Sequence, residues 1–362
     1  MTRLETPIAI YFALLAATAF PYLASAQDVD LQRVEMPGGD FVPDITEDQN
    51  GMLWFATQEG LVRYDGRVYR VYQHDSLDAS SISYNYVEAV HVDGDGTLWV
   101  GTYGGGLNRY DRETESFVRY RHDPDDPHSL SHDNVTAILE DRGGVLWIGT
   151  RGGLNRLNRE TGRFTRYVHD PDDPSSISND WARALYEDRD GRFWVGTHGG
   201  LNLFDREAGT FTRFLHEPGN YESLIEGRIS TILEDSQGQL WIGTGRSTGG
   251  LNLMDRDKGE FARYRFDDVA SNWPTEPQPE GPWTGGGITT IAEGADGVLW
   301  LGNWEGWVTR FDPKTGTAEN YNLRALNPSA TAEMHPFRIF QSSDGTVWIG
   351  SVDGPLYRAE PR

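Results

Sequence analysis

The segment Val145–Leu157, VLWIGTRGGLNRL, decides the fold because it recurs along the whole chain. Three copies are close, TLWVGTYGGGLNRY, RFWVGTHGGLNLF and QLWIGTGRSTGGLNLM, and three are looser, MLWFATQEGLVRY, VLWLGNWEGWVTR and TVWIGSVDGPLY. The tryptophans of the seven copies are Trp54, Trp99, Trp147, Trp194, Trp241, Trp300 and Trp348. They lie 45, 48, 47, 47, 59 and 48 residues apart, so one unit repeats along the chain.

Each copy reads as four short β-strands. In the third copy an alternating, β-branched stretch precedes an Asp-x-x-Gly turn and the tryptophan, and two more short apolar stretches follow. These four strands are expected at residues 135–140, 146–150, 153–157 and 164–168. Four strands with a glycine and an aromatic residue in each repeat are typical of a propeller blade. We therefore predict an all-β fold, a single seven-bladed β-propeller with four-stranded blades.

The two ends of the chain complement each other. The last copy stops after its third strand at Leu356–Arg358, and an orphan strand stands before the first copy at residues 30–35. We expect strand 30–35 to pair with the blade at 346–360 and to close the ring, because closure removes exposed sheet edges. Residues 27–362 would then form one domain.

Composition argues against several classes of partner. The chain has 362 residues, a net charge of −23 and no cysteine. Such a polyanion repels nucleic-acid phosphates and anionic lipids, so no nucleic-acid partner is expected. Without cysteine there are no disulfides, thiolate metal sites or cysteine nucleophiles. No spacing is diagnostic of a metal or a cofactor, and neither is expected.

The first 26 residues have the pattern of a secretory signal peptide. Arg3 precedes an apolar run over Ile8–Leu23, and Ala24-Ser25-Ala26 is a small-x-small cleavage pattern. A membrane anchor is the alternative, but Pro21 interrupts the run near its end. We expect cleavage at Ala26/Gln27, a periplasmic or secreted product, and no membrane span in the mature chain.

The repeat resembles a known family. The string Asp141-x-x-Gly-x-Leu-Trp-Ile-Gly-Thr-x-Gly-Gly-Leu-Asn-Arg, then Phe-x-x-Tyr and HDPDDPHSL at His122–Leu130, is similar to the two-component regulator propeller repeat. The resemblance implies the exported, ligand-sensing part of a bacterial sensor kinase, a class that often responds to carbohydrates. No stretch resembles a kinase, so the signal is expected to pass to a membrane sensor kinase in trans.

Positions that differ between the copies, at places facing the ring axis, are candidates for ligand binding. The residues thirteen before each tryptophan are Phe41, Tyr86, Asn134, Trp181, Arg228, Gly287 and His335. The residues four after it are Gln58, Tyr103, Arg151, His198, Gly245 with Arg246 beside it, Trp304 and Val352. Both sets should surround one mouth of the central channel. Aromatic, arginine, asparagine and histidine side chains suit a small-molecule or oligosaccharide ligand.

Two further places add candidates. Eleven residues before the tryptophan, Glu88 and Arg183 are the two charged residues. They either point into the channel or pair with neighbours. The other copies have Pro43, Thr136, Ser230, Thr289 and Phe337 at this place. The insertion Ser271–Gly287 carries Trp283. This insertion forms either a lid over the ligand or a plain surface loop. The predicted ligand-binding residues are Tyr86, Tyr103, Asn134, Arg151, Trp181, Arg183, His198, Arg228, Arg246, Trp283, Trp304 and His335.

Other readings stay open. A propeller enzyme, by analogy with the streptogramin lyases, would use His198 or His335 as a general base. A structural protein-interaction propeller is a third possibility. Two recurring sets of residues are expected to be structural: His74, His122, His169 and His216, and the glutamates Glu47, Glu140, Glu187, Glu234 and Glu293. The glutamates are expected to bind turn amides at the end opposite the mouth rather than a cation.

Overall fold

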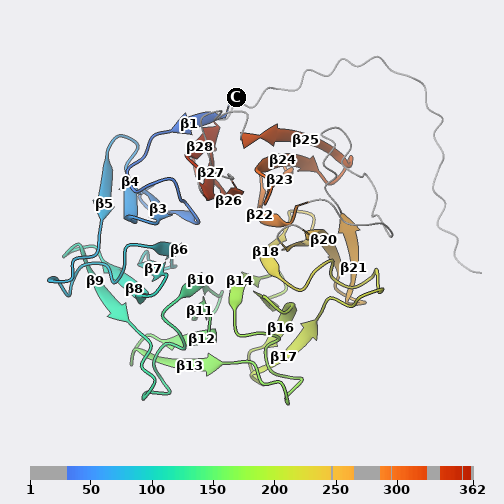
Figure 1. Ribbon diagram of the computed structural model, residues 1–362, viewed down its shortest axis with the longest axis horizontal. Helices are drawn as coiled ribbons and strands as arrows, with labels where there is room; N and C mark the ends of the chain where they lie inside the picture. Colours follow the sequence, from blue (N-terminus) through green and yellow to red (C-terminus); the bar gives the residue numbers. More distant parts are fainter. Residues whose placement is uncertain are drawn as a thin grey trace, which may run out of the picture. The chain divides into compact units, whose positions relative to one another are not determined.

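Seven four-stranded antiparallel sheets are arranged around a ring in the described part of the chain (Figure 1). The computed structural model describes residues 31–245, 248–264, 286–294, 296–323, 335–352 and 354–359, all within the compact unit Leu31–Arg362. Six sheets follow the chain order, and the first strand of each sheet contacts the first strands of the neighbouring sheets. The predicted seven-bladed β-propeller is confirmed.

The strands have these bounds. Blades 1 to 4 comprise β2 Ile45–Glu47, β3 Leu53–Thr57, β4 Gly60–Tyr64 and β5 Tyr69–Tyr72; β6 Val87–Val92, β7 Leu98–Thr102, β8 Gly106–Asp111 and β9 Ser116–Tyr120; β10 Val135–Glu140, β11 Leu146–Thr150, β12 Gly153–Asn158 and β13 Arg163–Tyr167; β14 Ala182–Glu187, β15 Phe193–Thr197, β16 Leu201–Asp205 and β17 Thr210–Phe214. Blades 5 to 7 comprise β18 Ile229–Glu234, β19 Leu240–Thr244, β20 Gly250–Asp255 and β21 Glu260–Tyr264; β22 Ile288–Glu293, β23 Leu299–Asn303, β24 Trp307–Asp312 and β25 Thr317–Asn322; β26 His335–Gln341, β27 Val347–Val352, β28 Leu356–Ala359 and β1 Gln32–Val34.

The ring is closed by a strand from the N-terminal side. β1 pairs antiparallel with β28, with Gln32 opposite Arg358 and Val34 opposite Leu356. The last sheet therefore has the order β1-β28-β27-β26. This confirms the predicted closure, with a pairing strand of three residues inside the expected 30–35.

The repeated Trp-x-Gly packs one blade against the next. Trp147 is buried against Phe193 and Phe204 of blade 4, at ring-centroid distances of 5.1 and 5.3 Å. Two residues later, a Cβ atom on Gly149 would lie 2.6 Å from the carbonyl oxygen of Ala182 in the same neighbouring blade. A side chain at this position would meet that carbonyl, which explains the glycine in six of the seven copies; the first copy has Ala56.

Neighbouring blades are joined by a charged cluster at the end opposite the predicted mouth, which we call the inter-blade clasp. Asp141 Oδ2 accepts hydrogen bonds from Trp147 Nε1 (2.8 Å) and from Arg206 of the next blade (2.9 Å). Arg206 also bonds Glu187 Oε1 at 2.8 Å, and Glu187 Oε2 accepts the backbone N–H of Arg142 at 2.7 Å. The aspartate–arginine pairs of the clasp are Asp48–Arg112, Asp93–Arg159, Asp141–Arg206 and Asp188–Arg256.

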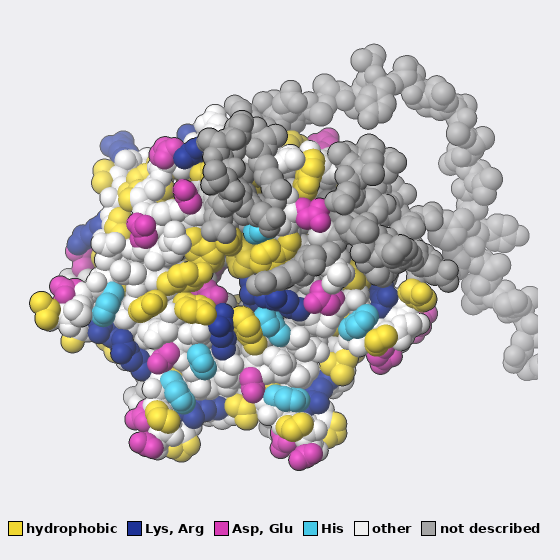
Figure 2. Space-filling view, in the orientation of Figure 1, with side chains coloured by type: hydrophobic (Ala, Val, Ile, Leu, Met, Phe, Trp, Pro, Cys, Tyr) yellow, Lys and Arg dark blue, Asp and Glu magenta, His cyan; other side chains and the backbone are white. Residues whose placement is uncertain are grey.

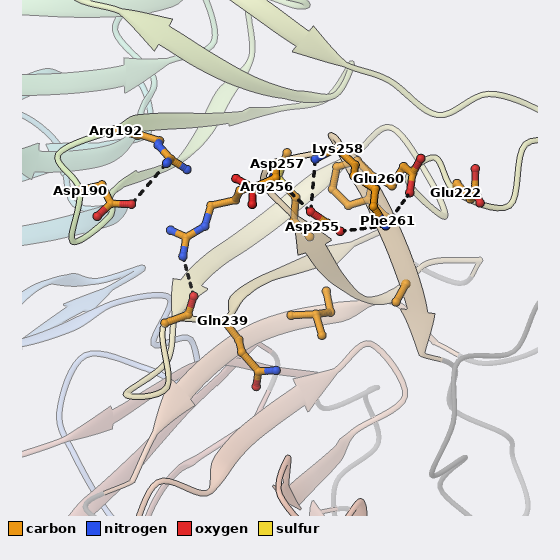
Figure 3. Close-up of a pocket in the computed structure, with 14 residues that line it drawn as sticks. Asp190, Arg192, Glu222, Gln239, Asp255, Arg256, Asp257, Lys258, Glu260 and Phe261 are labelled. Carbon is orange, nitrogen blue, oxygen red and sulfur yellow. Dashed lines mark hydrogen bonds and ion pairs between the residues drawn. The ribbon is translucent and has the colours of Figure 1, made fainter. Parts of the chain in front are cut away.

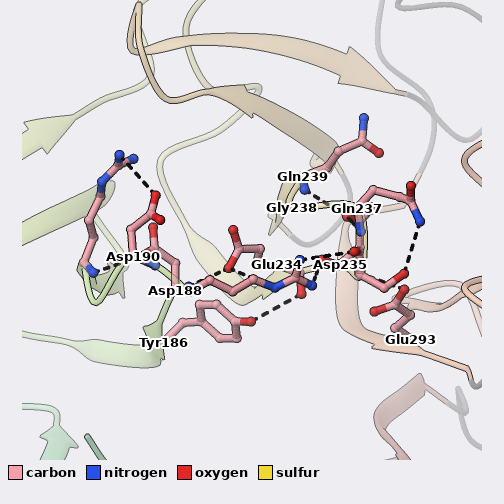
Figure 4. A network of polar contacts seen from close by, with 12 residues as sticks. Tyr186, Asp188, Asp190, Glu234, Asp235, Gln237, Gly238, Gln239 and Glu293 are labelled. Carbon is pink, nitrogen blue, oxygen red and sulfur yellow. Dashed lines mark hydrogen bonds and ion pairs between the residues drawn. The ribbon is translucent and has the colours of Figure 1, made fainter. Parts of the chain in front are cut away.

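The glutamates of the clasp have the structural role predicted for them. Figure 4 shows Glu234 between the turns of blades 4 and 5, where it accepts the backbone N–H of Arg189 at 2.7 Å. In the same view Glu293 accepts the N–H of Ser236 at 2.9 Å. Glu140, Glu187 and Glu47 accept turn N–H groups of the preceding blade in the same way. These glutamates are therefore part of the scaffold that joins neighbouring blades.

Candidate functional site

The two predicted sets of variable residues meet at one end of the blades. In five blades the residue four after the tryptophan donates its backbone N–H to the carbonyl of the residue thirteen before it, and in blade 7 the two stand opposite each other in the sheet. The pairs are Tyr103–Tyr86, Arg151–Asn134, His198–Trp181, Gly245–Arg228, Trp304–Gly287 and Val352–His335. The mouth predicted from spacing is therefore a real structural feature.

In six of the seven blades, a β-bulge in the inner strand turns one further residue into the central cavity. In blades 2 to 7 the pairing between the first and second strands skips one position. The skipped residues are Glu88, Thr136, Arg183, Ser230, Thr289 and Phe337. Bulges re-aim side chains in this way beside binding sites. All six line a central cavity of about 590 Å³.

Three of the six bulge residues form hydrogen bonds to the next blade. Thr136 Oγ1 donates to the carbonyl of Ala182 in the next blade at 2.5 Å. Ser230 and Thr289 bond in the same way to the carbonyls of Ile288 and Pro336. The other three bulge residues, Glu88, Arg183 and Phe337, carry no hydroxyl. Glu88 and Arg183 add charge to a cavity that Asp44, Glu293 and Arg338 also line, and Phe337 adds an aromatic ring.

An unbroken stack of rings and a guanidinium crosses blades 2 to 4 at the mouth. Arg151 Cζ lies 4.6 Å from the ring centroid of Tyr103 and 3.9 Å from that of Trp181, and its Nη1 donates to Tyr103 Oη at 2.9 Å. His198 lies 3.8 Å from Trp181, centroid to centroid. Two groups this close to one ring would clash on the same face, so Arg151 and His198 cover opposite faces of Trp181. Trp181 is therefore a support for Arg151 and offers no open face to a sugar.

A second aromatic cluster completes the mouth. Phe41 contacts Tyr86 at 5.0 Å and Phe337 at 6.4 Å between ring centroids. Phe337 lies 5.8 Å from Trp304 and has the guanidinium carbon of Arg183 4.9 Å from its centroid. Since Arg183 and Phe337 belong to blades 4 and 7, this contact spans the channel. Trp304 is fixed by its Nε1–H, which donates to the carbonyl of Gly245 at 3.0 Å.

Hydrophobic, basic and histidine side chains gather around the central opening in Figure 2. Burial raises the pKa of Glu88 beside this opening, although the guanidinium groups of Arg183 and Arg151 counteract the effect. Among the described residues, the buried side-chain atoms that make no hydrogen bond include Glu88 Oε2, Arg151 Nε and Trp181 Nε1. An unmet buried donor or acceptor costs about 1–3 kcal/mol, so such atoms mark a place where a ligand can supply the missing partner.

The structure places most of the predicted site residues at this mouth, and two lie outside the described residues. Arg246 and Trp283 belong to the latter group. Glu88, Phe41 and Phe337 were not among the predicted ligand-binding residues, yet they join the cavity or its aromatic wall. Their signal in the sequence is their offset from the tryptophan, eleven residues for Glu88 and Phe337 and thirteen for Phe41.

The histidines divide as the sequence predicts. His74, His122, His169 and His216 each bond through Nδ1 to the carbonyl eight residues later, at 2.8–2.9 Å, and so have a structural role. His198 and His335 stand at the mouth, against Trp181 and Trp304 respectively. In the part of the chain that the structure describes, no group of three or more His, Asp or Glu side chains is placed to hold a metal ion.

A second hollow, of about 600 Å³, lies on the outer side of blades 4 and 5 (Figure 3). Five of its charged side chains pair with one another: Arg192 with Asp190 at 3.3 Å, and Lys258 with Asp255 at 3.3 Å and Glu260 at 3.7 Å. Exposed pairs of this kind contribute little energy, and none of the buried polar atoms that lack a partner among the described residues lines this hollow. The central mouth is therefore the better candidate site.

Comparison with protein families gives two matches. The family described as "Two component regulator propeller" matches residues 223–246, and "SMP-30/Gluconolactonase/LRE-like region" matches residues 91–231. No curated protein matches the chain. One copy of the repeat thus matches the two-component regulator propeller family, as its residues indicated.

Solved structures extend the likeness over the whole ring. The extracellular domain of a putative hybrid two component system from B. thetaiotaomicron is 26% identical, with a TM-score of 0.74 over 91% of this chain and 41% of that one. The extracellular domain of a putative one component system from the same organism is 20% identical, with a TM-score of 0.59 over 88% of this chain and 47% of that one. The chain thus spans less than half the length of these two sensor domains.

One enzyme shares the fold. Catalytically inactive virginiamycin B lyase from Staphylococcus aureus with quinupristin has a TM-score of 0.66 at 15% identity, over 92% of this chain and 100% of that one. At this identity the likeness concerns the fold alone.

Among the described residues of the present chain, no helix is long and apolar enough to cross a membrane.

Proposed function

We propose that this chain is an exported, sensor-type β-propeller that binds a small molecule, in the first place a carbohydrate, at its mouth and signals through a separate membrane sensor kinase. The repeat and the sensor domains with the same fold support this assignment. The observation that carries it is the gathering at the mouth of buried polar atoms that find no hydrogen-bond partner among the described residues, including Glu88 Oε2, Arg151 Nε and Trp181 Nε1.

The arrangement suits binding because it is built in advance. Ligand sites combine apolar walls with a few fixed polar groups, and fixing those groups before binding lowers the entropy that binding must overcome. Here Arg151 is held by Tyr103 and Trp181, and Trp304 by the carbonyl of Gly245. Side chains of this mouth come from all seven blades, so a ligand would contact several blades at once.

Binding is tested by isothermal titration calorimetry of the purified protein against a panel of neutral and acidic oligosaccharides. Arg151→Ala and Trp304→Ala should each weaken binding of any ligand found by tenfold or more. Arg156→Met is the matched control, because Arg156 is exposed on β12 of the same blade as Arg151. Unchanged affinity in both mouth variants would remove the proposed site.

Export follows from the predicted signal peptide at residues 1–26 and fits the extracellular location of the sensor domains to which the chain is similar. N-terminal sequencing of the protein recovered from the periplasm or medium should begin at Gln27. A product that keeps Met1, or that stays in the cytoplasm, would contradict export.

The signalling partner is proposed from those same sensor domains. Chemical crosslinking in the native envelope, followed by mass spectrometry, should recover a membrane histidine kinase crosslinked to this chain in a ligand-dependent manner. Recovery of the chain without any kinase, with and without ligand, would contradict signalling in trans.

A second candidate function is hydrolase or lyase activity, favoured by the match of residues 91–231 to the SMP-30/gluconolactonase/LRE-like region. His198 or His335 would act as the general base. Profiling against lactones, esters and cyclic peptide lactones, with His198→Ala and His335→Ala alongside, tests it. Activity that both variants retain in full would exclude a mouth histidine as the base.

A further inference from the structure

Three consecutive blades bring hydrogen-bonding groups of both kinds to the mouth. Glu88 Oε2 of blade 2, Arg151 Nε of blade 3 and Trp181 Nε1 of blade 4 are buried and form no hydrogen bond with the described residues. The guanidinium carbon of Arg151 lies 3.9 Å from the ring centroid of Trp181, and the charge of Glu88 interacts with that of Arg151. A ligand that satisfies all three must offer acceptors to two N–H groups and a donor to a carboxylate.

Asn134 adds a further donor and acceptor at the same end of the blades. Its side chain belongs to a residue that is only 9% exposed, and its Oδ1 faces the turn after Tyr103, 3.9 Å from the position of a Cβ atom on Gly104. Within the described part of the chain, Asn134 is bonded through its backbone, to His132 Nδ1 and to the N–H of Arg151. The oxygen and the NH₂ group of its amide are therefore available to a ligand.

The cavity that continues from the mouth carries both signs of charge. Asp44, Glu88 and Glu293 line it together with Arg183 and Arg338. Asp44 and Arg338 form an ion pair with each other at 3.0 Å. Because neither sign dominates, the field of the cavity gives no general attraction to anions or to cations.

The groups at the mouth discriminate between classes of ligand. An anionic group would accept from Arg151 and Trp181, but the carboxylate of Glu88 would repel it. An ammonium group would donate to Glu88, but the guanidinium of Arg151 would repel it. A hydroxyl group both donates and accepts without carrying a charge, so neighbouring hydroxyls satisfy the carboxylate and the N–H groups together. Sites built to bond hydroxyl groups strongly reject analogues that leave buried groups unpaired.

We propose that the mouth binds a neutral saccharide whose neighbouring hydroxyl groups donate to Glu88 and accept the N–H groups of Arg151 and Trp181, with the amide of Asn134 as a further contact. This inference rests on the proposed function and narrows its ligand to the neutral class. Glu88 sets the specificity, because its carboxylate excludes an acidic sugar from the position that a hydroxyl occupies.

The probes are two matched series of trimers, measured by calorimetry. One series comprises the β-1,4-linked trimers of glucose, glucuronate and glucosamine, and the other the α-1,4-linked trimers of galactose, galacturonate and galactosamine. At least one neutral trimer should bind about tenfold or more tightly than both of its charged counterparts. Its affinity should stay within about twofold between 50 and 500 mM salt, since screening acts on charged ligands.

Two variants and a control test the assigned groups. Glu88→Gln should weaken the neutral trimer about tenfold, because a charge-assisted hydrogen bond becomes a neutral one, and should reduce its advantage over the acidic trimer. Trp181→Phe keeps a ring between Arg151 and His198 but removes Nε1–H, so it should weaken the neutral trimer by about 3- to 10-fold. Glu160→Gln removes the same charge from an exposed turn and should stay within about twofold. Melting temperatures of the three variants show that the ring is folded.

Distinct results would overturn the neutral class. These are tighter binding of an acidic or an amino trimer than of the neutral one, or an unchanged preference between the neutral and acidic trimers in folded Glu88→Gln. If a charged trimer binds best and Arg151→Ala abolishes that binding, the proposed function stands and this inference falls. If no saccharide of these series or of the wider panel binds the wild-type protein, both fall together.

Discussion

Replacing Arg206 by methionine should open the inter-blade clasp between blades 3 and 4. The guanidinium bonds Asp141 Oδ2 at 2.9 Å, Glu187 Oε1 at 2.8 Å and the carbonyl of Gly191 at 2.6 Å. The two carboxylate side chains are only 4% and 8% exposed, whereas Arg206 is 32% exposed. Methionine keeps most of the side-chain volume and removes all three bonds.

The size of the stability loss follows from the buried carboxylate charge that remains without its partner. Removing one partner of a buried ion pair costs about 3–5 kcal/mol, because the other charge stays buried. Water reaches part of this site through the exposed side of Arg206, so we expect the lower end, about 3 kcal/mol. An unfolding entropy of about 0.7 kcal/mol/K for a domain of this size converts the loss to a melting temperature lower by about 4 °C.

The stability loss caused by Arg206→Met should depend on pH in a defined direction. Burial alone would raise the pKa of Asp141, but hydrogen bonds from Trp147, Val145 and Arg206 outweigh burial and hold the pKa below its usual value. A carboxyl with a lowered folded-state pKa stabilises the protein above the unfolded pKa of about 3.9, and this contribution is lost as pH falls further. The difference between wild type and Arg206→Met should therefore be constant above about pH 5 and shrink below about pH 4.

Urea unfolding followed by tryptophan fluorescence, together with calorimetry, measures both effects. Arg109→Met is the matched control, since Arg109 is exposed on β8 and lies outside the clasp. It should change stability by less than about 0.5 kcal/mol. A loss at Arg206 no larger than this control, or a loss that stays the same down to pH 3.5, would refute the role assigned to the clasp.

Three further predictions concern the scaffold of the ring. Thr136→Val keeps the shape but removes the bond to the carbonyl of Ala182, so it should lower the free energy of unfolding by about 1 kcal/mol in urea titration; no change would argue against that bond. Asn155→Ala removes buried bonds to Ser131 N, Ser131 Oγ and the carbonyl of Ile148, and should cost about 2–4 kcal/mol in the same assay, well above the Thr136 value. Deletion of residues 31–35 exposes the edge of β28, so the protein should melt earlier and self-associate in analytical ultracentrifugation; a stable monomer would show that β1 is dispensable.

The fold was predictable because its determinants are local and repeated. One stretch around Trp147 specifies strand, turn and strand, and six more copies leave little doubt about the number of blades. The orphan strand near Gln32 and the incomplete last copy at Leu356 indicated closure, and β1 pairs with β28 as expected. The position of the mouth was equally predictable from the sequence, because a fixed offset from a repeated tryptophan places residues at the same height in every blade.

The chemistry of the site was less predictable because it depends on contacts between different copies. Trp181 suggested a sugar platform by its residue type, but Arg151 from the preceding blade and His198 from its own blade cover its faces. The bulge that turns Arg183 toward the axis is a property of strand pairing and leaves no mark in a single repeat. The clasp arginines, by contrast, recur twelve to fifteen residues after the tryptophan in blades 2 to 5, so Arg206 could have been found by comparing copies.

The closure of the ring has a mechanical consequence. β1 and β28 are antiparallel, and Gln32 stands opposite Arg358, so the chain enters and leaves the seventh blade at the same end of this strand pair. A pull on the two ends would load the pairs of backbone hydrogen bonds one after another, as in opening a zipper, rather than all at once in shear. The pairing of β1 with β28 is thus weak against tension between its ends, because its hydrogen bonds are loaded one at a time. A single-molecule experiment should find an early, low-force opening of blade 7 before the other six blades unfold.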